Sequence, residues 1–325
     1  MMQLPTYDDV TAAHARIAAL VVRTPMLRHP VLDQLTGGTI LIKPETLQRT
    51  GSFKLRGASN AILQLDAAQR RAGVVTHSSG NHGQATAFAA ASVGARATIF
   101  MPDDAPTIKV ESTRRWGAEI RRYNRHTDDR EGMTRAHAEA TGAVLVPPFD
   151  HADVIAGQGT LALELIEDAA AAGFTMDAML ACTGGGGLIA GCALAIEGAS
   201  PGTKLYAVEP AGWDDTGRSL ASGQRETNAP GGSTLCDALL AKQPGQLTFA
   251  VNRPRLAGGI AVTDAEVMAA IRFAFSHLKL VVEPGGAVCL AALLAGTFDC
   301  TGRVVGIVLS GGNVDADVFG RALAG

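Results

Sequence analysis

The 325-residue sequence predicts an α/β protein with doubly wound, mostly parallel sheets. Apolar, strand-like runs alternate with alanine-rich helical stretches along the chain. Some runs, such as VVGIVL at 304–309, are apolar throughout, as expected for strands covered on both faces of a sheet. No low-complexity linker or internal repeat interrupts the alternation, so one pattern accounts for the whole sequence.

The alternation can be followed from one predicted strand to the next. Each of the first three strands precedes a helix: TILIKPE (39–45) the helix that begins near Lys54, GVVTHSSG (73–80) the stretch 83–93, and ARATIFMP (95–102) the stretch 106–117. In the second half, DAMLAC (177–182) meets the helix of GGGGLIAGCALAI, KLYAVEP (204–210) follows, and RVVGIVLSGGN (303–313) closes the series.

Charge and composition exclude several classes of partner. With 28 basic and 31 acidic residues the net charge is −3, which gives no electrostatic reason to expect nucleic acid or a membrane surface. We see no uninterrupted apolar run of about 18 residues and no signal peptide in MMQLPTYDDV. The five cysteines form no CxxC pair, so we expect free thiols in a reducing compartment. The predicted location is therefore cytoplasmic.

A lysine stands where the helix after TLQRTGSF begins. Helix N-termini carry partial positive charge and therefore disfavour ammonium groups. Lys54 is thus badly placed for a structural cation and well placed for a lysine that works as a neutral amine or an imine.

The segment ACTGGGGLIAG (181–191) reads as a strand, a glycine run and a helix. Consecutive backbone amides that open onto a helix N-terminus form an anion cradle, so we expect a phosphate there. Gly185-x-Gly187-x-x-Ala190, with Glu209 about 20 residues on, also matches a dinucleotide fingerprint. An NAD-type oxidoreductase therefore stays open as an alternative at this point.

Two further turns carry polar side chains at strand ends. THSSGNHGQA (76–85) offers Ser78, Ser79 and Asn81 where α/β sheets bind ligands, and we interpret the neighbouring His82 as a core residue. VLSGGNVD (308–315) places the Ser310 hydroxyl at the carboxyl end of an apolar strand.

Together these motifs resemble the fold-type II pyridoxal-phosphate enzymes, in the branch of serine/threonine dehydratases and serine racemases. TGSFKLRGA, SSGNHGQA, VIAGQGTLALE, the glycine run and LSGGNVD occur in the family's order from about residue 5 to 320. The resemblance implies a two-lobed, tryptophan synthase β-like fold with a mobile small lobe at 66–148. Residues 1–65 and 149–325 would form the large lobe, without a C-terminal regulatory domain. It also implies a homodimer and a small amino acid as substrate.

The resemblance also assigns roles to individual residues. Lys54 would carry pyridoxal 5′-phosphate as a Schiff base, Phe53 would lie against the ring, and Ser310 would meet the pyridine nitrogen. Asn81 would contact the ring 3-hydroxyl, and the phosphate would be held by Gly184, Gly185, Gly186 and Gly187. This chain departs from the family pattern at two places. Relatives usually read Ala-Asp-Gly where it has Cys236-Asp237-Ala238, which puts the ring-facing contact there in doubt. EPGGA around Glu283 differs from the more usual EPSGA or EPTAG, which implies a shifted substrate preference.

The expected reaction is β-elimination from a 3-hydroxy amino acid such as L-threonine or L-serine, with Lys54 removing the Cα proton. A hydroxyl at Ser310 would leave the ring a weaker electron sink than a carboxylate would, which favours prompt loss of the β-hydroxyl. The alternatives are a serine racemase that uses Ser79 on the opposite face, or a 3-hydroxyaspartate dehydratase.

Substrate contacts are expected from Ser78, Ser79 and Asn81. Arg130 fits a solvated arginine at a helix start, but the resemblance implies that it would hold either the substrate carboxylate or a second acidic group. Glu209 and Asp215 are candidates for a magnesium or calcium site, since hard cations prefer oxygen ligands. The resemblance to serine racemases implies the carbonyl of Trp213 as a further ligand.

Overall fold

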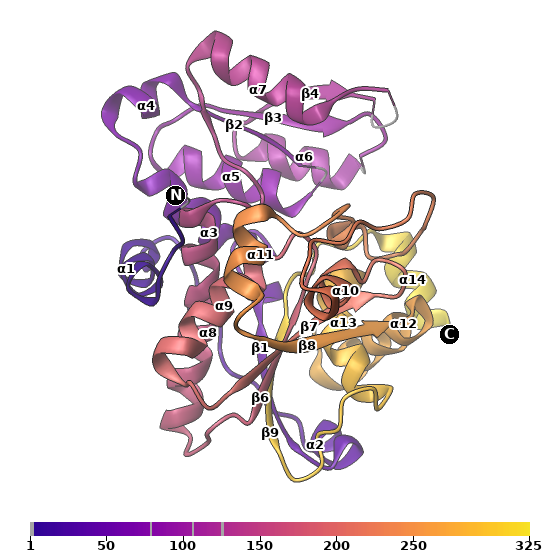
Figure 1. Cartoon of the computed structure of the whole chain (residues 1–325). Helices are drawn as coiled ribbons and strands as arrows, with labels where there is room; N and C mark the ends of the chain where they lie inside the picture. The colour runs from indigo at the N-terminus through magenta and orange to yellow at the C-terminus, as the bar shows by residue number, and fades with distance from the viewer. Residues whose placement is uncertain (1–2, 79, 106, 125–126) are drawn as a thin grey trace.

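The computed structural model describes residues 3–78, 80–105, 107–124 and 127–325 and contains two parallel sheets (Figure 1). The larger sheet has the strand order β1-β9-β6-β7-β8, and the smaller has the order β4-β3-β2-β5. Every pair of neighbouring strands in both sheets is parallel. The architecture confirms the predicted fold class.

The strands of the larger sheet are β1 (Thr39–Pro44), β6 (Ala178–Cys182), β7 (Lys204–Pro210), β8 (Leu256–Val262) and β9 (Val304–Leu309). Those of the smaller sheet are β2 (Val74–His77), β3 (Ala97–Pro102), β4 (Glu119–Tyr123) and β5 (Val144–Leu145). All four strands of the smaller sheet lie within residues 66–148, the segment that we propose as the small lobe.

Helices follow most strands. Those up to the end of the smaller sheet are α1 (Tyr7–Ile17), α2 (Pro30–Thr36), α3 (Lys54–Leu63), α4 (Ala67–Ala72), α5 (Asn81–Ser92), α6 (Thr107–Arg115) and α7 (Arg130–Thr141), with the short η1 (Glu45–Leu47). The later helices are α8 (Ala152–Ala171), α9 (Gly187–Ala199), α10 (Asp215–Ser222), α11 (Gln246–Asn252), α12 (Asp264–Phe273), α13 (Pro284–Leu294) and α14 (Ala316–Ala324), with the short η2 (Asp237–Leu239) and η3 (Ala274–Leu278).

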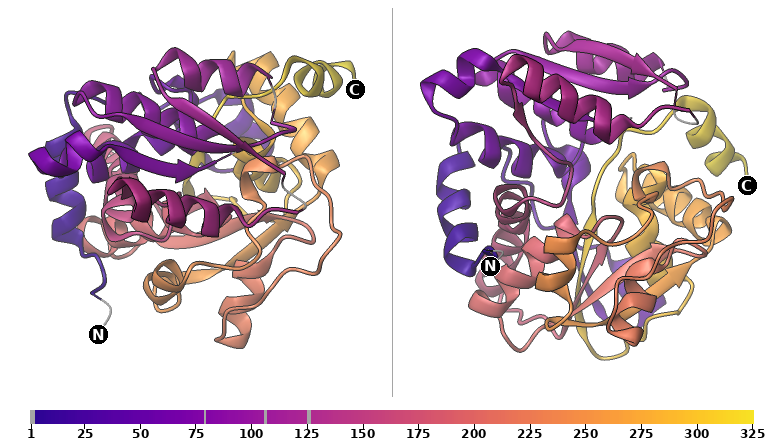
Figure 2. Two further views of the ribbon diagram at one scale, coloured as in Figure 1. Left: turned by 90° about the horizontal axis from the view of Figure 1, so that it is seen from above. Right: turned by 45° about the horizontal axis from the view of Figure 1, so that its top comes forward.

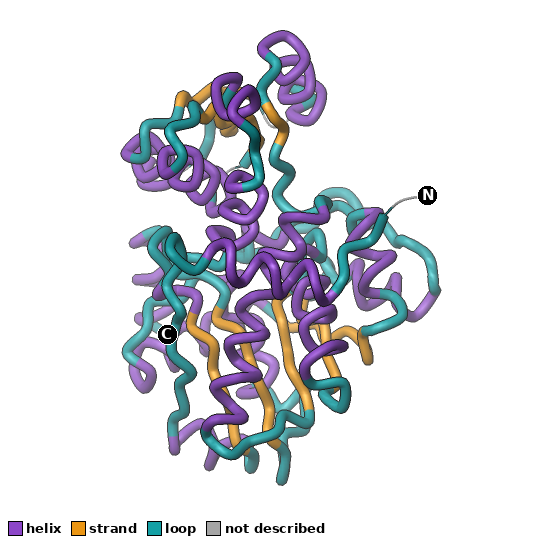
Figure 3. The backbone as a smooth tube through the Cα atoms, turned by 90° about the vertical axis from the view of Figure 1, so that its left-hand side faces the viewer, coloured by secondary structure: helices purple, strands orange, loops and turns teal. Residues whose placement is uncertain are grey.

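The larger sheet is covered on both faces. Helices α8 and α9 pack together on one face, and α13 packs across β6, β7, β8 and β9 on the other (Figure 1). Figure 3 shows helices in front of and behind the strands of this sheet. This arrangement explains why β9 is apolar along its length, since its residues Val305 and Ile307–Leu309 are buried. Helices α1 and α14 lie at opposite sides of the molecule (Figure 2).

Helices α3, α8 and α9 meet through glycines. A Cβ atom on Gly157 of α8 would lie 2.7 Å from the Cα of Gly57 in α3. Likewise, a Cβ on Gly191 of α9 would lie 2.8 Å from the Cα of Gly159 in α8. The three helix backbones are therefore in direct contact, which fixes α3 against the helical layer behind the sheet.

A buried ionic network also fixes α3. Arg56 is fully buried and donates hydrogen bonds of 2.7–2.8 Å to the carboxylates of Glu45 and Glu164. Lys43 of β1 donates to Glu164 as well, at 2.7 Å. Such a network, with each charge paired, fixes the relative positions of the elements more than it stabilises the fold. Here it connects β1, α3 and α8, and Arg56 lies two residues after Lys54.

The cysteines and His82 lie where the sequence predicts them. All five cysteines are free and buried, as expected from their scatter. His82 is also a core residue, since it is buried and its Nε2 lies 2.9 Å from the carbonyl of Val146. In the described part of the chain, no helix has the length and apolarity needed to cross a membrane.

Candidate active site

Helix α3 begins at Lys54, and its start is joined to the end of β9. The amide of Phe53, the residue before the helix, donates to the carbonyl of Ser310 at 3.0 Å. The Lys54 Nζ donates to the carbonyl of Pro148 at 2.7 Å and lies 5.1 Å from the centre of the Phe53 ring. Lys54 is thus held at the carboxyl ends of the strands of the larger sheet, beside the segment that connects β5 to α8.

The Lys54 amine is easier to deprotonate than an ordinary lysine. Burial lowers its pKa to about 8, against the opposing effects of Cys182 and Glu283. The direction agrees with the neutral amine expected from the sequence. The leading cause, however, is burial among protein atoms, rather than the helix start on which the sequence argument rested.

The four glycines follow β6, and the last of them, Gly187, begins α9. Gly186 has φ 90°, a left-handed conformation that favours glycine. The Thr248 hydroxyl donates to the carbonyl of Gly185 at 2.7 Å, and the Asn252 amide donates to the carbonyl of Gly186 at 3.3 Å. These bonds fix the orientation of the peptide planes. The amides at the start of α9 have no acceptor within the helix and are available to an anion.

The ring of Phe149 packs directly on this loop. A Cβ atom at either Gly185 or Gly187 would collide with Phe149, and one at Gly184 would lie 3.1 Å from the Cα of Leu239. The glycines therefore allow Phe149 and Leu239 to pack closely on the two sides of the loop. They also leave its backbone amides uncovered by side chains.

Asn81, the first residue of α5, belongs to a polar chain that the sequence motifs did not reveal. Its Nδ2 donates to Glu283 Oε1 at 2.6 Å, and its Oδ1 accepts from Asn313 Nδ2 at 2.7 Å. Burial, reinforced by Asp237, raises the pKa of Glu283 to about 7, and its Oε2 is buried without a hydrogen-bond partner. A buried oxygen without a hydrogen-bond partner is rare in proteins and is consistent with a place for a bound ligand.

The remaining predicted substrate residues lie near the end of β2. The Ser78 Oγ accepts from the amide of Gly80 at 3.1 Å, and Ser79 falls outside the described residues. Arg130 is exposed at the start of α7. Burial, assisted by the positive charge of Arg130, lowers the pKa of His77 to about 4, which places that charge near the turn after β2.

Ser310 follows β9 and is 4% exposed. Burial raises the pKa of the Cys182 thiol to about 11, against a hydrogen bond with the Ser310 side chain. The hydroxyl therefore faces the end of β6, at the same edge of the sheet as Lys54.

Two predicted metal ligands are buried side by side. Burial, reinforced by Asp215, raises the pKa of Glu209 to about 8, and burial raises that of Asp215 to about 6. The Asp215 Oδ2 has no hydrogen-bond partner, whereas both oxygens of Glu209 accept backbone amides, from Thr216 at 2.9 Å and Gly217 at 2.8 Å.

Two adjacent buried carboxylates, neither of which forms a salt bridge with a described residue, fit a cation, although the charge of Arg218 is near enough to act on Asp215. No group of three or more His, Cys, Asp or Glu side chains among the described residues is arranged for a metal, so any such site would depend on the Trp213 carbonyl.

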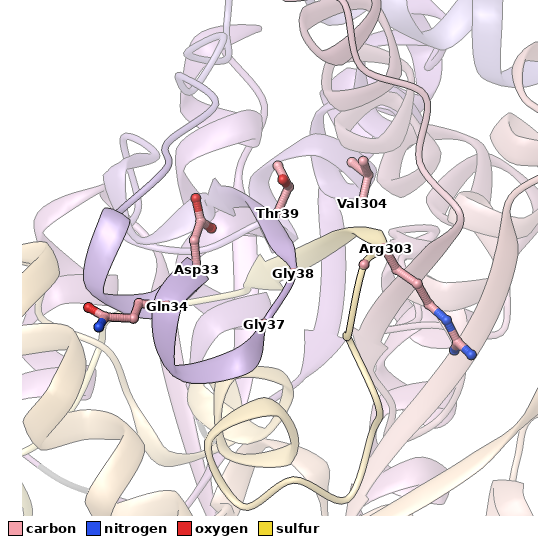
Figure 4. Close-up of a pocket in the computed structure, with 8 residues that line it drawn as sticks. Asp33, Gln34, Gly37, Gly38, Thr39, Arg303 and Val304 are labelled. Carbon is pink, nitrogen blue, oxygen red and sulfur yellow. The ribbon is translucent and has the colours of Figure 1, made fainter.

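A separate hollow lies at the amino ends of β1 and β9 (Figure 4). Two charged residues line it. Asp33 accepts hydrogen bonds from Arg28 at 2.7 Å and from the amide of Ile40 at 2.8 Å, and Arg303 donates to the carbonyl of Asp299 at 3.2 Å. The hollow is at the opposite end of the sheet from Lys54 and carries no comparable chemistry.

Comparison with known proteins decides the family. Residues 17–311 match the family model described as pyridoxal-phosphate dependent enzyme. The chain belongs to this family. The match confirms the resemblance seen in the sequence and the predicted cofactor, and it replaces the NAD-type alternative.

Individual relatives in this family have different activities. The chain is 44% identical to an L-threo-3-hydroxyaspartate ammonia-lyase of Pseudomonas sp. over 100% of both chains. It is 39% identical to an L-threonine ammonia-lyase of Thermotoga maritima, over 98% of this chain and 78% of the relative. The structure of maize serine racemase superposes with a TM-score of 0.93 at 38% identity, covering 99% of this chain and 98% of the maize protein.

Proposed function

We propose that the protein is an ammonia-lyase that dehydrates a 3-hydroxy amino acid, such as L-threonine or L-serine, and releases a 2-oxo acid and ammonia. The observation that carries this proposal is Lys54, an amine with its pKa lowered to about 8 at the carboxyl ends of the larger sheet. The ammonia-lyases among the relatives support the same reaction class.

The residues around Lys54 fit pyridoxal phosphate. Lys54 would hold its aldehyde carbon, and Phe53 would lie against the ring. The phosphate would be held by the amides of Gly184–Gly187, whose peptide planes Thr248 and Asn252 orient. Asn81 and Ser310 would hold the polar atoms of the ring. When bound, the cofactor stabilises negative charge at the substrate Cα.

The chain's own residues then carry out the proton transfer and the positioning. The Lys54 Nζ, kept in place by the Pro148 carbonyl, takes the proton from the substrate Cα as a general base. Ser78, in the turn before α5, and Asn81, the first residue of α5, receive the substrate carboxylate, because a helix N-terminus favours an anion. Loss of the Cβ hydroxyl gives a dehydrated amino acid that water hydrolyses to the 2-oxo acid and ammonia.

The test is Lys54→Ala. We expect this variant to fold, to lose the visible absorption of the bound cofactor and to release no 2-oxo acid from serine or threonine. Wild-type turnover retained in the variant would disprove the role of Lys54.

A second candidate substrate is 3-hydroxyaspartate, favoured by the Pseudomonas relative and by the exposed charge of Arg130 near the turn after β2. If Arg130 binds the second carboxylate, Arg130→Ala should lower kcat/KM for 3-hydroxyaspartate by a factor that corresponds to about 2–4 kcal/mol of transition-state binding. The kcat/KM for L-threonine should stay unchanged. Arg135→Ala, an exposed arginine on the same helix, is the matched control. A small, uniform change on both substrates would identify Arg130 as a solvated arginine.

Racemisation is a further alternative, supported by the likeness to maize serine racemase. It would require an acid or base on the opposite face of Cα, for which the sequence offers Ser79. Ser79→Ala should abolish any racemisation or action on D-serine and spare elimination from L-serine. Equal losses for both enantiomers would contradict this role.

We also propose a magnesium or calcium ion at Glu209, Asp215 and the Trp213 carbonyl, a homodimer as the working form, and a cytoplasmic location. The unpartnered Asp215 oxygen supports the cation. The five free thiols support a reducing compartment.

A further inference from the structure

Lys109 and Asp237 form an ion pair between the part of the chain around the smaller sheet and the part around the larger sheet. Lys109 lies on α6, beside the smaller sheet, whereas Asp237 lies in η2, in the part of the chain that surrounds the larger sheet. Lys109 Nζ and Asp237 Oδ2 are 2.6 Å apart. Of the salt bridges seen between described residues, this is the one that connects residues 66–148 to the rest of the protein.

The pair also connects the two turns that we assign to substrate and phosphate. A Cβ atom on Gly80 would lie 3.4 Å from the Cδ and 3.7 Å from the Nζ of Lys109, so the lysine lies along the turn that precedes Asn81. On the other side, a Cβ on Gly184 would lie 3.6 Å from the carbonyl of Ala238, next to Asp237.

The two side chains of the pair differ in the fraction of their surface that is exposed. The Lys109 side chain is 9% exposed and that of Asp237 is 46% exposed. Burial alone would lower the pKa of Lys109, but the Asp237 carboxylate, assisted by the negative charges of Glu283 and Asp315, raises the pKa above the ordinary value. Without Asp237, therefore, the nearly buried ammonium group would lose the carboxylate that lies 2.6 Å away, which is costly.

We propose that Lys109 and Asp237 are positioning residues that hold the substrate turn, with its described residues Ser78, Gly80 and Asn81, against the glycine loop. Among the described residues, the side chains of Lys109 and Asp237 hydrogen-bond to each other and to none of the residues assigned to the cofactor. Their effect is on substrate affinity, because the pair sets the distance between two turns that must bind one molecule together. The part of this inference that concerns substrate rests on the proposed function.

The kinetic test uses Lys109→Met, Asp237→Asn and the exchanged pair Lys109→Glu with Asp237→Lys. We expect each single variant to raise KM for the amino acid about tenfold or more with a smaller change in kcat, and the exchanged pair to recover part of the loss. Arg255→Met is the control, since Arg255 and Glu197 form a 3.0 Å pair of similar unequal exposure, 24% and 53%, away from this junction.

Salt provides a second readout. Because Asp237 is half-exposed, added salt should weaken the pair and raise KM of the wild type, and Lys109→Met should show a flatter dependence. A purely structural role would lower stability without changing the salt dependence of KM.

Hydrogen exchange tests the positioning without any turnover. In the apoprotein, backbone amides of residues 80–84 should exchange faster in Lys109→Met and Asp237→Asn than in wild type or Arg255→Met, and the exchanged pair should restore protection. Unchanged exchange in both single variants would overturn the proposal. If no amino acid is turned over but exchange changes as expected, the proposed function fails and the positioning of the turn stands.

Discussion

Lys54 combines two properties that a lysine on a protein surface lacks. Its amine is fixed by the Pro148 carbonyl, and burial brings its pKa to about 8 from an ordinary value of 10.5. A larger fraction of the amine is therefore neutral near physiological pH. Neutral amines, and not ammonium groups, add to aldehydes and accept protons.

A prediction at this scale concerns the uptake of pyridoxal phosphate by the apoprotein. Because the neutral form increases as pH rises through the pKa of Lys54, the rate of uptake should rise with a midpoint near pH 8 and level off above it. The rate is measured from the growth of visible absorbance between pH 6 and 10. A midpoint near 10.5 would mean that burial does not lower the pKa of Lys54.

At the scale of single elements, the turn between β7 and α10 brings Glu209 and Asp215 together. Both carboxyls have raised pKa values, so their contribution to stability is fully present when both are protonated at low pH. It is lost as pH rises through about 6 for Asp215 and about 8 for Glu209. A divalent cation binds the ionised forms and should reverse that loss.

We therefore expect calcium or magnesium to raise the Tm of chelator-treated protein clearly at pH 8.5 and very little at pH 5. The Asp215→Asn variant, which keeps the size of the side chain and removes its charge, should lose the cation effect at pH 8.5. An equal shift of Tm at both pH values, or one that persists in Asp215→Asn, would rule out this site.

The elements also show what a sequence can and cannot predict. The helix that begins at Lys54 and the glycine run before α9 were predictable, because each rests on a short, local motif. The contacts of Glu283 with Asn81, of Asn313 with Asn81 and of Lys109 with Asp237 were not, because they join residues more than 100 positions apart. The cause of the Lys54 pKa shift was also hidden, since burial depends on the packing of both halves.

At the scale of the whole molecule, three large apolar side chains outside the smaller sheet remain half-exposed. Leu47, Phe275 and Val281 are each about 45% exposed, at 46%, 45% and 46%. Segments around Leu47 and Val281 adjoin, since a Cβ atom on Gly312 would meet the carbonyl of Val281 and lie 3.3 Å from the Cβ of Thr46. Exposed large apolar side chains on neighbouring segments are typical of an interface.

We predict that this surface, defined by Leu47, Phe275 and Val281, is buried between two copies of the chain. Light scattering after size-exclusion chromatography should give a dimer for wild type and a shift toward monomer for Val281→Asp. Leu35→Asp is the control, because Leu35 is 63% exposed on α2, outside the defined surface. A monomeric wild type, or a dimer unaffected by Val281→Asp, would refute the interface.

The glycine contacts among α3, α8 and α9 have a consequence for how this protein can diverge. Where backbone meets backbone, even alanine, ordinarily the mildest replacement in a helix, forces two helices apart. Gly57, Gly157, Gly159 and Gly191 should therefore be the positions most depleted of every substitution when a library of single variants is selected for folded protein. The intolerance should be strict at these four glycines and relaxed at Gly94 and Gly296, where a Cβ atom would have no neighbour within 4 Å and only the left-handed backbone restricts the residue.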